Sequence, residues 1–123
     1  MADAIAQQFV QQYYKTFDEN RAGLGSLYTD SSVLTFEGTQ HVGPAQIIEK
    51  LTNLPFRTVQ HAVTTRDCLQ LDPQSLLVSV IGQLKTDDDP IHGFTEVFVL
   101  KQFGDSLFIV CQIFRLALHN LPT

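Results

Sequence analysis

Histidines and carboxylates are the side chains of this sequence that could do acid–base or metal chemistry. The four histidines are His41, His61, His92 and His119; none is paired with another at helical ligand spacing, and no cysteine lies near them in sequence. A metal site usually needs convergent ligands at a recognisable spacing, so we expect no metal and no cofactor. The sequence also contains no glycine-rich phosphate loop and no nucleophile motif.

His61 is the histidine best placed for proton transfer, because it comes early in an expected strand, just after Pro55-Phe56. A histidine inside a cone-shaped pocket can act as a general acid or base when a carboxylate is within reach. Asp67 and Glu37 are the candidate partners. No spacing defines a dyad, so we favour the alternative that His61 is structural or contacts a binding partner.

The run Asp87-Asp88-Asp89-Pro90 joins two long apolar strands. Aspartate and proline are common turn residues, but a turn needs only one or two of them. The run is therefore either an ordinary turn or an acidic surface that meets Arg or Lys of a partner. Glu37, in another turn, allows the same two interpretations. Phe36 beside it would anchor an interface if it were exposed.

Length and composition indicate one globular domain over residues 1–123, with 44% hydrophobic and 17% charged residues. The net charge of -5, without basic clusters, argues against nucleic-acid binding. No apolar run is long enough to cross a membrane, and no signal peptide is visible. The two cysteines, Cys68 and Cys111, lie in apolar stretches and make no disulfide framework, which favours the cytosol or nucleus.

The elements that must position these residues can be read from periodicity and turn signals. Ile5, Phe9, Tyr13 and Phe17 form the apolar stripe of a helix that ends near Asn20. Short elements follow at 24–28 (helix) and 32–36 (strand), and a helix opens at Gly43-Pro44 and stops by about Asn53. Four strands are then expected at 57–71 (bent), 75–85, 93–103 and 106–119. Short turns between sequential strands predict an antiparallel meander.

The last two strands are apolar on both faces. In 106–119, one face holds Leu107, Ile109, Cys111 and Ile113, and the other holds Phe108, Val110, Phe114, Leu116 and Leu118. In 93–103, Phe94, Phe98 and Leu100 lie opposite Val97 and Val99. A sheet with one wet face would alternate apolar and polar residues, so both faces must be covered. The helices cover one, and a second copy of the chain covers the other; the alternative is a sheet that curls and buries both faces itself.

Several segments, in order along nearly the whole chain, carry a resemblance to a known family. They are Tyr13-Tyr14 with Phe17-Asp18, LTFEG at 34–38, KLTNLPF at 50–56, GQLK at 82–85, DDDPI at 87–91 and FRLALHN at 114–120. Together they make the chain similar to the nuclear transport factor 2 family. The resemblance implies an α+β fold, a cone of about three N-terminal helices packed on a bent antiparallel sheet, with homodimers formed through the sheet.

The resemblance also implies a function. Members of this family carry the small GTPase Ran, in its GDP form, into the nucleus, bind FxFG repeats of nuclear pore proteins, and catalyse no reaction. The expected location is the cytoplasm and nucleus, concentrated at the nuclear envelope and its pores. The same fold serves dehydratases and isomerases, and an mRNA-export adaptor subunit, so these remain alternatives.

By position, the resemblance assigns Glu37, Asp87 and Asp89 as acids that pair with basic residues of Ran. A hydrophobic cavity would accept an aromatic side chain of Ran. The candidates for its lining or rim are Phe36, Leu54, Phe56, Val59, His61, Phe94, Ile113 and Phe114. Phe36 stands where relatives commonly have tryptophan, and the aromatic residue that helps to hold FxFG repeats is missing near Ala2.

Overall fold

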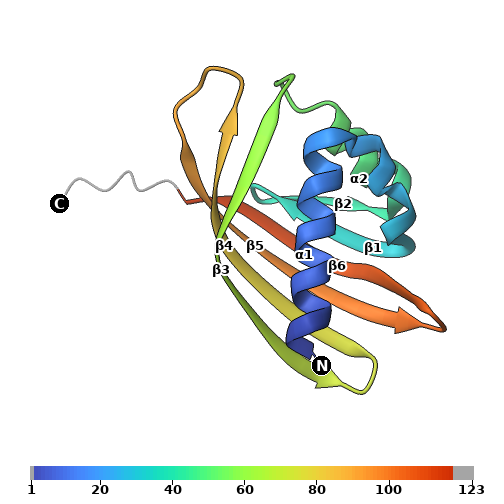
Figure 1. Ribbon diagram of the computed structural model, residues 1–123. Coiled ribbons are helices and arrows are strands. Elements are labelled where there is room, and N and C mark those ends of the chain that lie inside the picture. The colour runs from blue at the N-terminus through green and yellow to red at the C-terminus, as the bar shows by residue number, and fades with distance from the viewer. Residues whose placement is uncertain (1, 118–123) are drawn as a thin grey trace.

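The computed structural model describes residues 2–117, as two α-helices, one 3-10 helix and a six-stranded sheet (Figure 1). The elements are α1 (Ala2–Glu19), η1 (Arg21–Leu27), β1 (Tyr28–Phe36), β2 (Thr39–Val42), α2 (Gly43–Thr52), β3 (Val59–Asp72), β4 (Ser75–Thr86), β5 (His92–Phe103) and β6 (Ser106–Leu116). The expected cone-like α+β fold is confirmed. The expected end of the last strand near His119, together with Leu118, lies outside the described residues.

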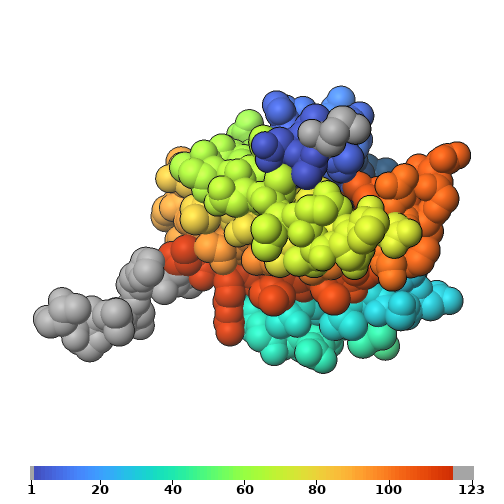
Figure 2. All heavy atoms as spheres, turned by 90° about the horizontal axis from the view of Figure 1, so that it is seen from below, coloured from blue at the N-terminus to red at the C-terminus, as the bar shows by residue number. Residues whose placement is uncertain are grey.

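The strand order is β2-β1-β6-β5-β4-β3. The antiparallel meander of β3, β4, β5 and β6 is confirmed. The expectation of a wholly antiparallel sheet is wrong, because β1 pairs with β6 in parallel. Seen from below, the orange-red atoms of β6 accordingly lie between the yellow-green hairpin of β3 and β4 and the cyan atoms of β1 and β2 (Figure 2). The short strand β2 was not expected, since Glu37-Gly38 was interpreted as a turn alone.

Helix α1 lies across the concave face of the sheet (Figure 1). Its apolar stripe is buried there: Ala6, Phe9, Val10, Tyr13, Tyr14 and Phe17. Facing residues of the sheet complete the core, among them Val78, Phe98 and Leu100, each with 0% of its surface exposed. The periodicity that predicted the helix also selects the face that it buries, except at Ile5, which was expected in the stripe but exposes 41% of its surface.

The sheet bends because β3 and β4 are irregular at one level. The register of β3 shifts between Val63 and Thr65, opposite Gly82 in β4. A Cβ atom on Gly82 would lie 2.4 Å from the carbonyl oxygen of Ala62 and 2.9 Å from the Phe94 ring. Only glycine fits this close approach, so it permits the bend expected for this hairpin.

A β-bulge in β6 exchanges the faces of the residues that precede it. Val99 pairs with Cys111 and Leu100 with Ile109, so Val110 is the extra residue. Strict alternation placed Leu107 and Ile109 with Cys111 and Ile113, and Phe108 with Phe114. In the structure Leu107 and Ile109 pack in the concave core, whereas Phe108 contacts Phe103 on the other side, and Cys111 and Ile113 are exposed on the convex face. The expected faces of Leu107, Phe108 and Ile109 are therefore wrong, because a bulge resets the two-residue period.

The opposite, convex face of the sheet is apolar and has no cover within the described chain. Exposed Ile81, Cys111 and Ile113 lie there beside the partly buried Val97 and Val99. Ile81 and Ile113 each expose 51% of their surface. The helices therefore cover only one side of the sheet, as expected from the sequence.

Candidate binding cavity

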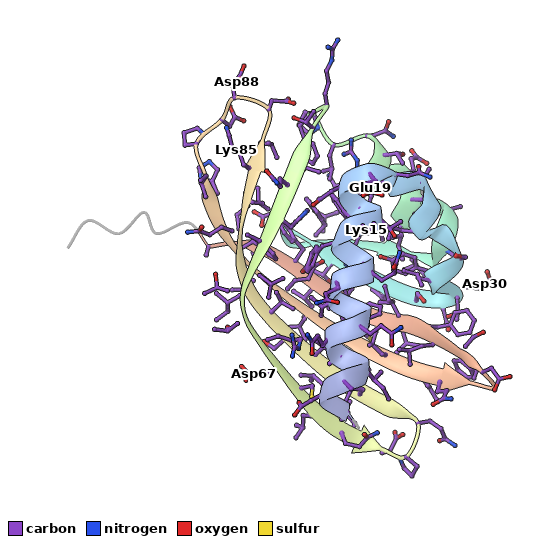
Figure 3. All side chains as sticks on the ribbon, in the orientation of Figure 1. Lys15, Glu19, Asp30, Asp67, Lys85 and Asp88 are labelled. Atoms are coloured by element: carbon purple, nitrogen blue, oxygen red, sulfur yellow. The ribbon has the colours of Figure 1, made fainter. Side chains whose placement is uncertain are left out.

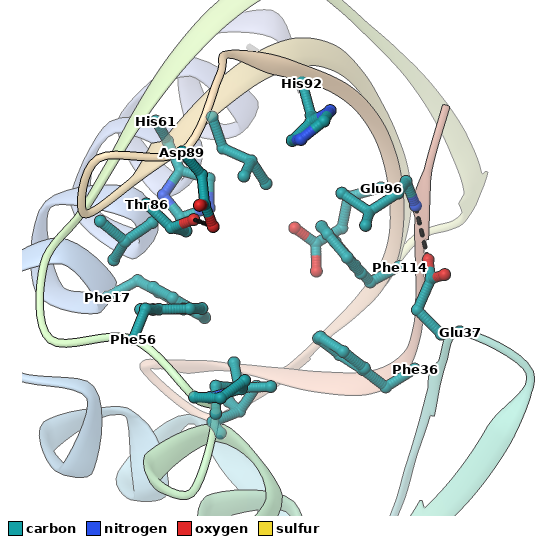
Figure 4. A pocket seen from close by; sticks show the side chains of 16 residues that line it. Phe17, Phe36, Glu37, Phe56, His61, Thr86, Asp89, His92, Glu96 and Phe114 are labelled. Carbon is teal, nitrogen blue, oxygen red and sulfur yellow. Dashed lines mark hydrogen bonds between the residues drawn. The ribbon is translucent and has the colours of Figure 1, made fainter. Parts of the chain in front are cut away.

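A cavity of about 310 Å³ opens where α1 ends, between the concave face of the sheet, the end of α2 and the segment that leads into β3 (Figure 4). Most of the residues assigned by the resemblance meet here: Phe36, Glu37, Leu54, Phe56, Val59, His61, Asp89 and Phe114. These residues come from β1, two loops, β3, the β4–β5 turn and β6, so the fold brings together positions that are far apart in sequence.

Three of the assigned residues do not line the cavity. Ile113 is wrong as a cavity residue: it points to the convex face, because it alternates with the inward-facing Gln112 and Phe114. Phe94 is fully buried behind the wall, with its ring 5.8 Å from that of Phe114. Asp87 lies outside the cavity, on the acidic turn.

Stacked phenylalanines form one wall. The rings of Phe36 and Phe114 are 4.7 Å apart and nearly parallel, at 15°. Phe36 is half-buried, and the Nζ atom of Lys50 lies over its ring, 5.2 Å from the ring centre. On the opposite side of the cavity, the guanidinium carbon of Arg21 lies over Phe56, 4.6 Å from the ring centre. Arg21 also donates to the carbonyl oxygens of Leu51 and Phe56, which fixes the loop at the mouth.

His61 is held in the wall by Asp18 of α1. Its Nδ1 atom is 2.6 Å from Asp18 Oδ1, and its backbone N–H donates to Asp18 Oδ2 at 3.1 Å. The His61 side chain is 3% exposed and packs between the rings of Tyr14 and Phe17. A carboxylate therefore does lie within reach of this histidine, but it is neither Asp67 nor Glu37. Asp18 was missed, although Phe17-Asp18 was among the segments that carried the resemblance.

Glu96 is a carboxylate inside the cavity that sequence reasoning missed. It is 4% exposed, and it accepts hydrogen bonds from the Tyr14 hydroxyl at 2.8 Å and from Gln112 Nε2 at 2.6 Å. Burial raises its pKa to about 6, against the opposing effects of Gln112, Tyr14 and His61. The sequence held a signal for it, since Glu96 is two residues from both Phe94 and Phe98 and so lies with them on the inward face of β5.

Gln112 links this carboxylate to the core. Besides Glu96, its Nε2 donates to the Tyr13 hydroxyl at 2.8 Å, and its Oε1 accepts from the Tyr28 hydroxyl at 2.7 Å. Burial raises the pKa of the phenols of Tyr13 and Tyr28, so both stay neutral. Each polar group of this network has a partner, as buried polar groups require.

Two carboxylates lie at the rim of the cavity. Glu37 occupies the β1–β2 turn with φ 51°, and its Oε1 accepts the backbone N–H of Leu116 (Figure 4). Asp89 lies on the β4–β5 turn and lines the cavity from the other side. The rim is thus acidic at two places around an apolar interior.

Asp87 organises the acidic turn. Its Oδ1 accepts the backbone N–H of Thr58 at 2.9 Å and that of Arg57 at 3.1 Å, and its own N–H donates to the Thr58 carbonyl at 3.1 Å. These backbone donors, that of Thr58 first, lower the pKa of the Asp87 carboxyl. Asp88 points away from the molecule at the tip of the same turn (Figure 3).

Residues 2–117 show neither a metal-binding cluster nor a membrane-spanning helix. No group of three or more His, Cys, Asp or Glu side chains in this range could hold a metal ion. No helix in the same range is both long and apolar enough to cross a membrane. The described cysteines, Cys68 and Cys111, are free thiols.

Comparison with known proteins agrees with this geometry. The family model for the nuclear transport factor 2 (NTF2) domain matches residues 5–116. Nuclear transport factor 2 of Emericella nidulans is 49% identical over 122 residues, covering 94% of this chain and 97% of the relative. Nuclear transport factor 2 of Oryza sativa is 46% identical over 118 residues, covering 94% and 96%. The solved structure of nuclear transport factor 2 from Cryptosporidium parvum superposes with a TM-score of 0.87 at 42% identity, covering 93% of each chain.

The aromatic cavity inside a cone of helices on a bent sheet is therefore that of a nuclear transport factor 2-like fold. The chain belongs to the nuclear transport factor 2 family. Its function is that of a nuclear transport carrier, and the relatives favour neither the enzyme nor the export adaptor that the sequence left open.

Proposed function

We propose that this carrier binds the GDP-bound form of Ran and brings it into the nucleus without catalysing a reaction. The observation that carries the proposal is an apolar, aromatic-walled cavity with carboxylates on opposite sides of its mouth, Glu37 and Asp89. An aromatic side chain of the partner enters the cavity and contributes most of the binding energy. The rim carboxylates meet basic residues of the partner and set its orientation and rate of association.

The acidic turn extends this contact surface. The side chain of Asp87 is exposed although its carboxylate also accepts backbone hydrogen bonds, so its charge still faces a partner. Lys85 Nζ donates to the backbone carbonyls of Asp87 and Asp89 rather than to their carboxylates. The negative charge of the turn is therefore left for basic residues of Ran.

Calorimetric titration with Ran tests the proposal, using Ran loaded with GDP and, in parallel, with a GTP analogue. We expect binding to the GDP form only. Glu37→Gln is the sharpest variant, because the amide oxygen still accepts the Leu116 N–H while the charge is lost. It should weaken binding by roughly tenfold or more. Asp105→Asn, in the distant β5–β6 turn, is the matched control. Equal binding of both nucleotide forms, or of wild type and Glu37→Gln, would contradict the assignment.

The carrier acts as a homodimer through the convex face of its sheet. The support is the uncovered apolar surface around Ile81, Val97 and Ile113. Sedimentation equilibrium should give twice the chain mass. Ile113→Glu, which places a charge in that surface, should give a folded monomer. A wild-type monomer at micromolar concentration would rule out this interface.

Binding of FxFG repeats and enrichment at the nuclear pore complete the proposal, and the support for both is membership of the family. Titration of labelled protein with an FxFG peptide, against a peptide with serine in place of both phenylalanines, tests the first. Imaging of a fluorescent fusion tests the second. A diffuse signal with no rim at the nuclear envelope would contradict it.

The pair of His61 and Asp18 has a structural role in this proposal. An enzyme of the same fold would also need such a pair, since a carboxylate orients a histidine for proton transfer. Here the two hydrogen bonds from His61 to Asp18 fix the imidazole among aromatic rings as part of the wall. Asp18→Ala should therefore reduce affinity for GDP-bound Ran. Unchanged affinity in a folded Asp18→Ala variant would remove this role.

A further inference from the structure

Glu96 is a charged group at the inner wall of an otherwise apolar cavity, and partner docking at the rim makes no use of it. Figure 4 shows its carboxylate pointing into the cavity from β5. Tyr14 and Gln112 each donate one hydrogen bond, to Oε1 and Oε2 respectively. Each carboxylate oxygen can accept a second hydrogen bond, so both retain capacity for a donor that enters the cavity.

The charges around the cavity are unbalanced. Of the described residues that line it, Glu37, Asp89 and Glu96 are acidic, and none is a lysine or arginine. The cations of Lys50 and Arg21 lie at its edge, over Phe36 and Phe56. They offset two of the three carboxylates, and the inward-facing Glu96 then favours a positively charged occupant over a negative one.

The walls suit an aromatic occupant. Phenylalanine rings pack well against another ring. Lys50 already lies over Phe36 and Arg21 over Phe56, so the positive charge of an occupant is left to Glu96. The volume of about 310 Å³ lies at the small end of the range for ligand pockets, so it admits a group of about one or two rings.

A glutamate at position 96 is also costly for the fold, since burial disfavours its charged form. A glutamine of the same shape could keep a hydrogen bond with Gln112 and with Tyr14 and would bring no charge. A destabilising charge in a cavity is typical of a binding site rather than of a core.

We propose that the cavity binds a small aromatic cation of the amidine type, with its ring among the phenylalanines and its N–H groups donating to the Glu96 carboxylate. An amidinium matches a carboxylate with two parallel hydrogen bonds. The ligand fills the volume that the proposed function gives to an aromatic side chain of the partner, so the two compete. Binding of the small molecule itself does not depend on the proposed function.

Benzamidine is the probe, and benzamide, which has a similar shape but no charge, is the control. Titration of the purified full chain, followed by the backbone amide signals of cavity residues such as Val59 and Thr86, should give saturable shifts with benzamidine. Benzamide should bind about tenfold to a hundredfold more weakly, as expected for loss of charge-assisted hydrogen bonds. Equal binding of the two probes, shifts spread over the surface, or no saturable shift would overturn the proposal.

Glu96→Gln is the matched variant and should lose benzamidine affinity to a similar extent while its affinity for benzamide stays within about twofold. Should Glu96→Gln fail to fold, Leu54→Trp, at a half-buried position of the lining, provides the second test, because the larger side chain fills the cavity and should abolish binding of both probes. Unchanged benzamidine binding in either folded variant contradicts the site.

A competition titration distinguishes this site from the proposed function. Saturating benzamidine should weaken binding of GDP-bound Ran if both occupy the cavity. Benzamidine binding in a protein that does not bind Ran would leave the small-molecule site standing and reject the carrier assignment. Simultaneous binding of both without interference would place one of them elsewhere and overturn the shared-cavity part of the inference.

Discussion

The two ends of the concave sheet face use the same kind of residue in different ways. At the closed end, Phe98 is fully buried and meets Phe9 and Tyr13 edge to face, at 5.1 and 5.0 Å between ring centres. At the open end, Phe36 and Phe114 stack face to face at 4.7 Å, and Phe36 keeps part of its surface exposed. Aromatic side chains thus form the core where α1 crosses them and the wall of a cavity where α1 has ended.

The polar network marks the boundary between these ends. Gln112 holds Tyr13 and Tyr28 on the core side and Glu96 on the cavity side. A buried network that is fully paired makes a region rigid, whereas a half-paired one is destabilising. The network therefore gives the cavity a fixed floor without filling it.

The largest contrast should come from truncating one phenylalanine at each end. Phe98→Ala should lower the free energy of unfolding by about 3–5 kcal/mol, because it leaves a cavity in packed core. Phe36→Ala should lower the free energy of unfolding by only roughly 1–2 kcal/mol, since a half-exposed ring loses less buried surface. It should nevertheless weaken binding of GDP-bound Ran more than Phe98→Ala does. Urea unfolding and calorimetry measure the two effects. Equal losses of stability would erase the distinction between the ends.

Glu96→Gln should have a smaller effect of the opposite sign, an increase in the free energy of unfolding. In the folded protein the pKa of Glu96 is raised to about 6 from 4.5, so the carboxyl favours folding below pH 4.5 and that contribution is lost as pH rises through about 6. Glu96→Gln should be more stable than wild type by about 2 kcal/mol at pH 7.5. The two should be equally stable near pH 4. A difference that does not change with pH would mean that Glu96 is not the titrating group.

The smallest effect is local to the acidic turn. Asp87→Ala removes the acceptor of the Arg57 and Thr58 amides, so these amides should exchange hydrogen faster while the core is unaffected. Asp88→Ala is the matched control, because Asp88 extends from the tip of the turn (Figure 3). Hydrogen exchange followed by NMR measures both. Equal protection in the two variants would mean that Asp87 does not hold the turn.

The sequence predicted the elements that repeat a period and missed those that interrupt one. The stripe from Phe9 to Phe17 and the alternation of Phe94, Phe98 and Leu100 gave a helix and a strand on the correct faces. The bulge at Val110 was not predictable from alternation, because one extra residue leaves both neighbouring runs apolar. Leu107, Phe108 and Ile109 were therefore placed on the wrong faces.

The site residues that lie in matching segments were assigned through the resemblance, and those that depend on tertiary contact alone were missed. The turns of Glu37 and Asp89 left their role open, and the resemblance made them candidates; the structure places both at the cavity. Asp18 reaches His61 only because α1 crosses β3, across a separation of 43 residues. Neither the helix period nor the strand period indicates which carboxylate is the partner of a histidine.

The parallel pairing of β1 with β6 also has a consequence for how the protein is made. Strand β1 leaves the ribosome well before β6, yet Val33 and Phe36 pair with Cys111 and Phe114 of that strand. One edge of β1 stays unpaired until β6 emerges, and contacts between distant parts of a sequence form slowly. The cavity wall of Phe36 and Phe114 therefore assembles only after β6 has been made, and a nascent chain has no complete cavity before that.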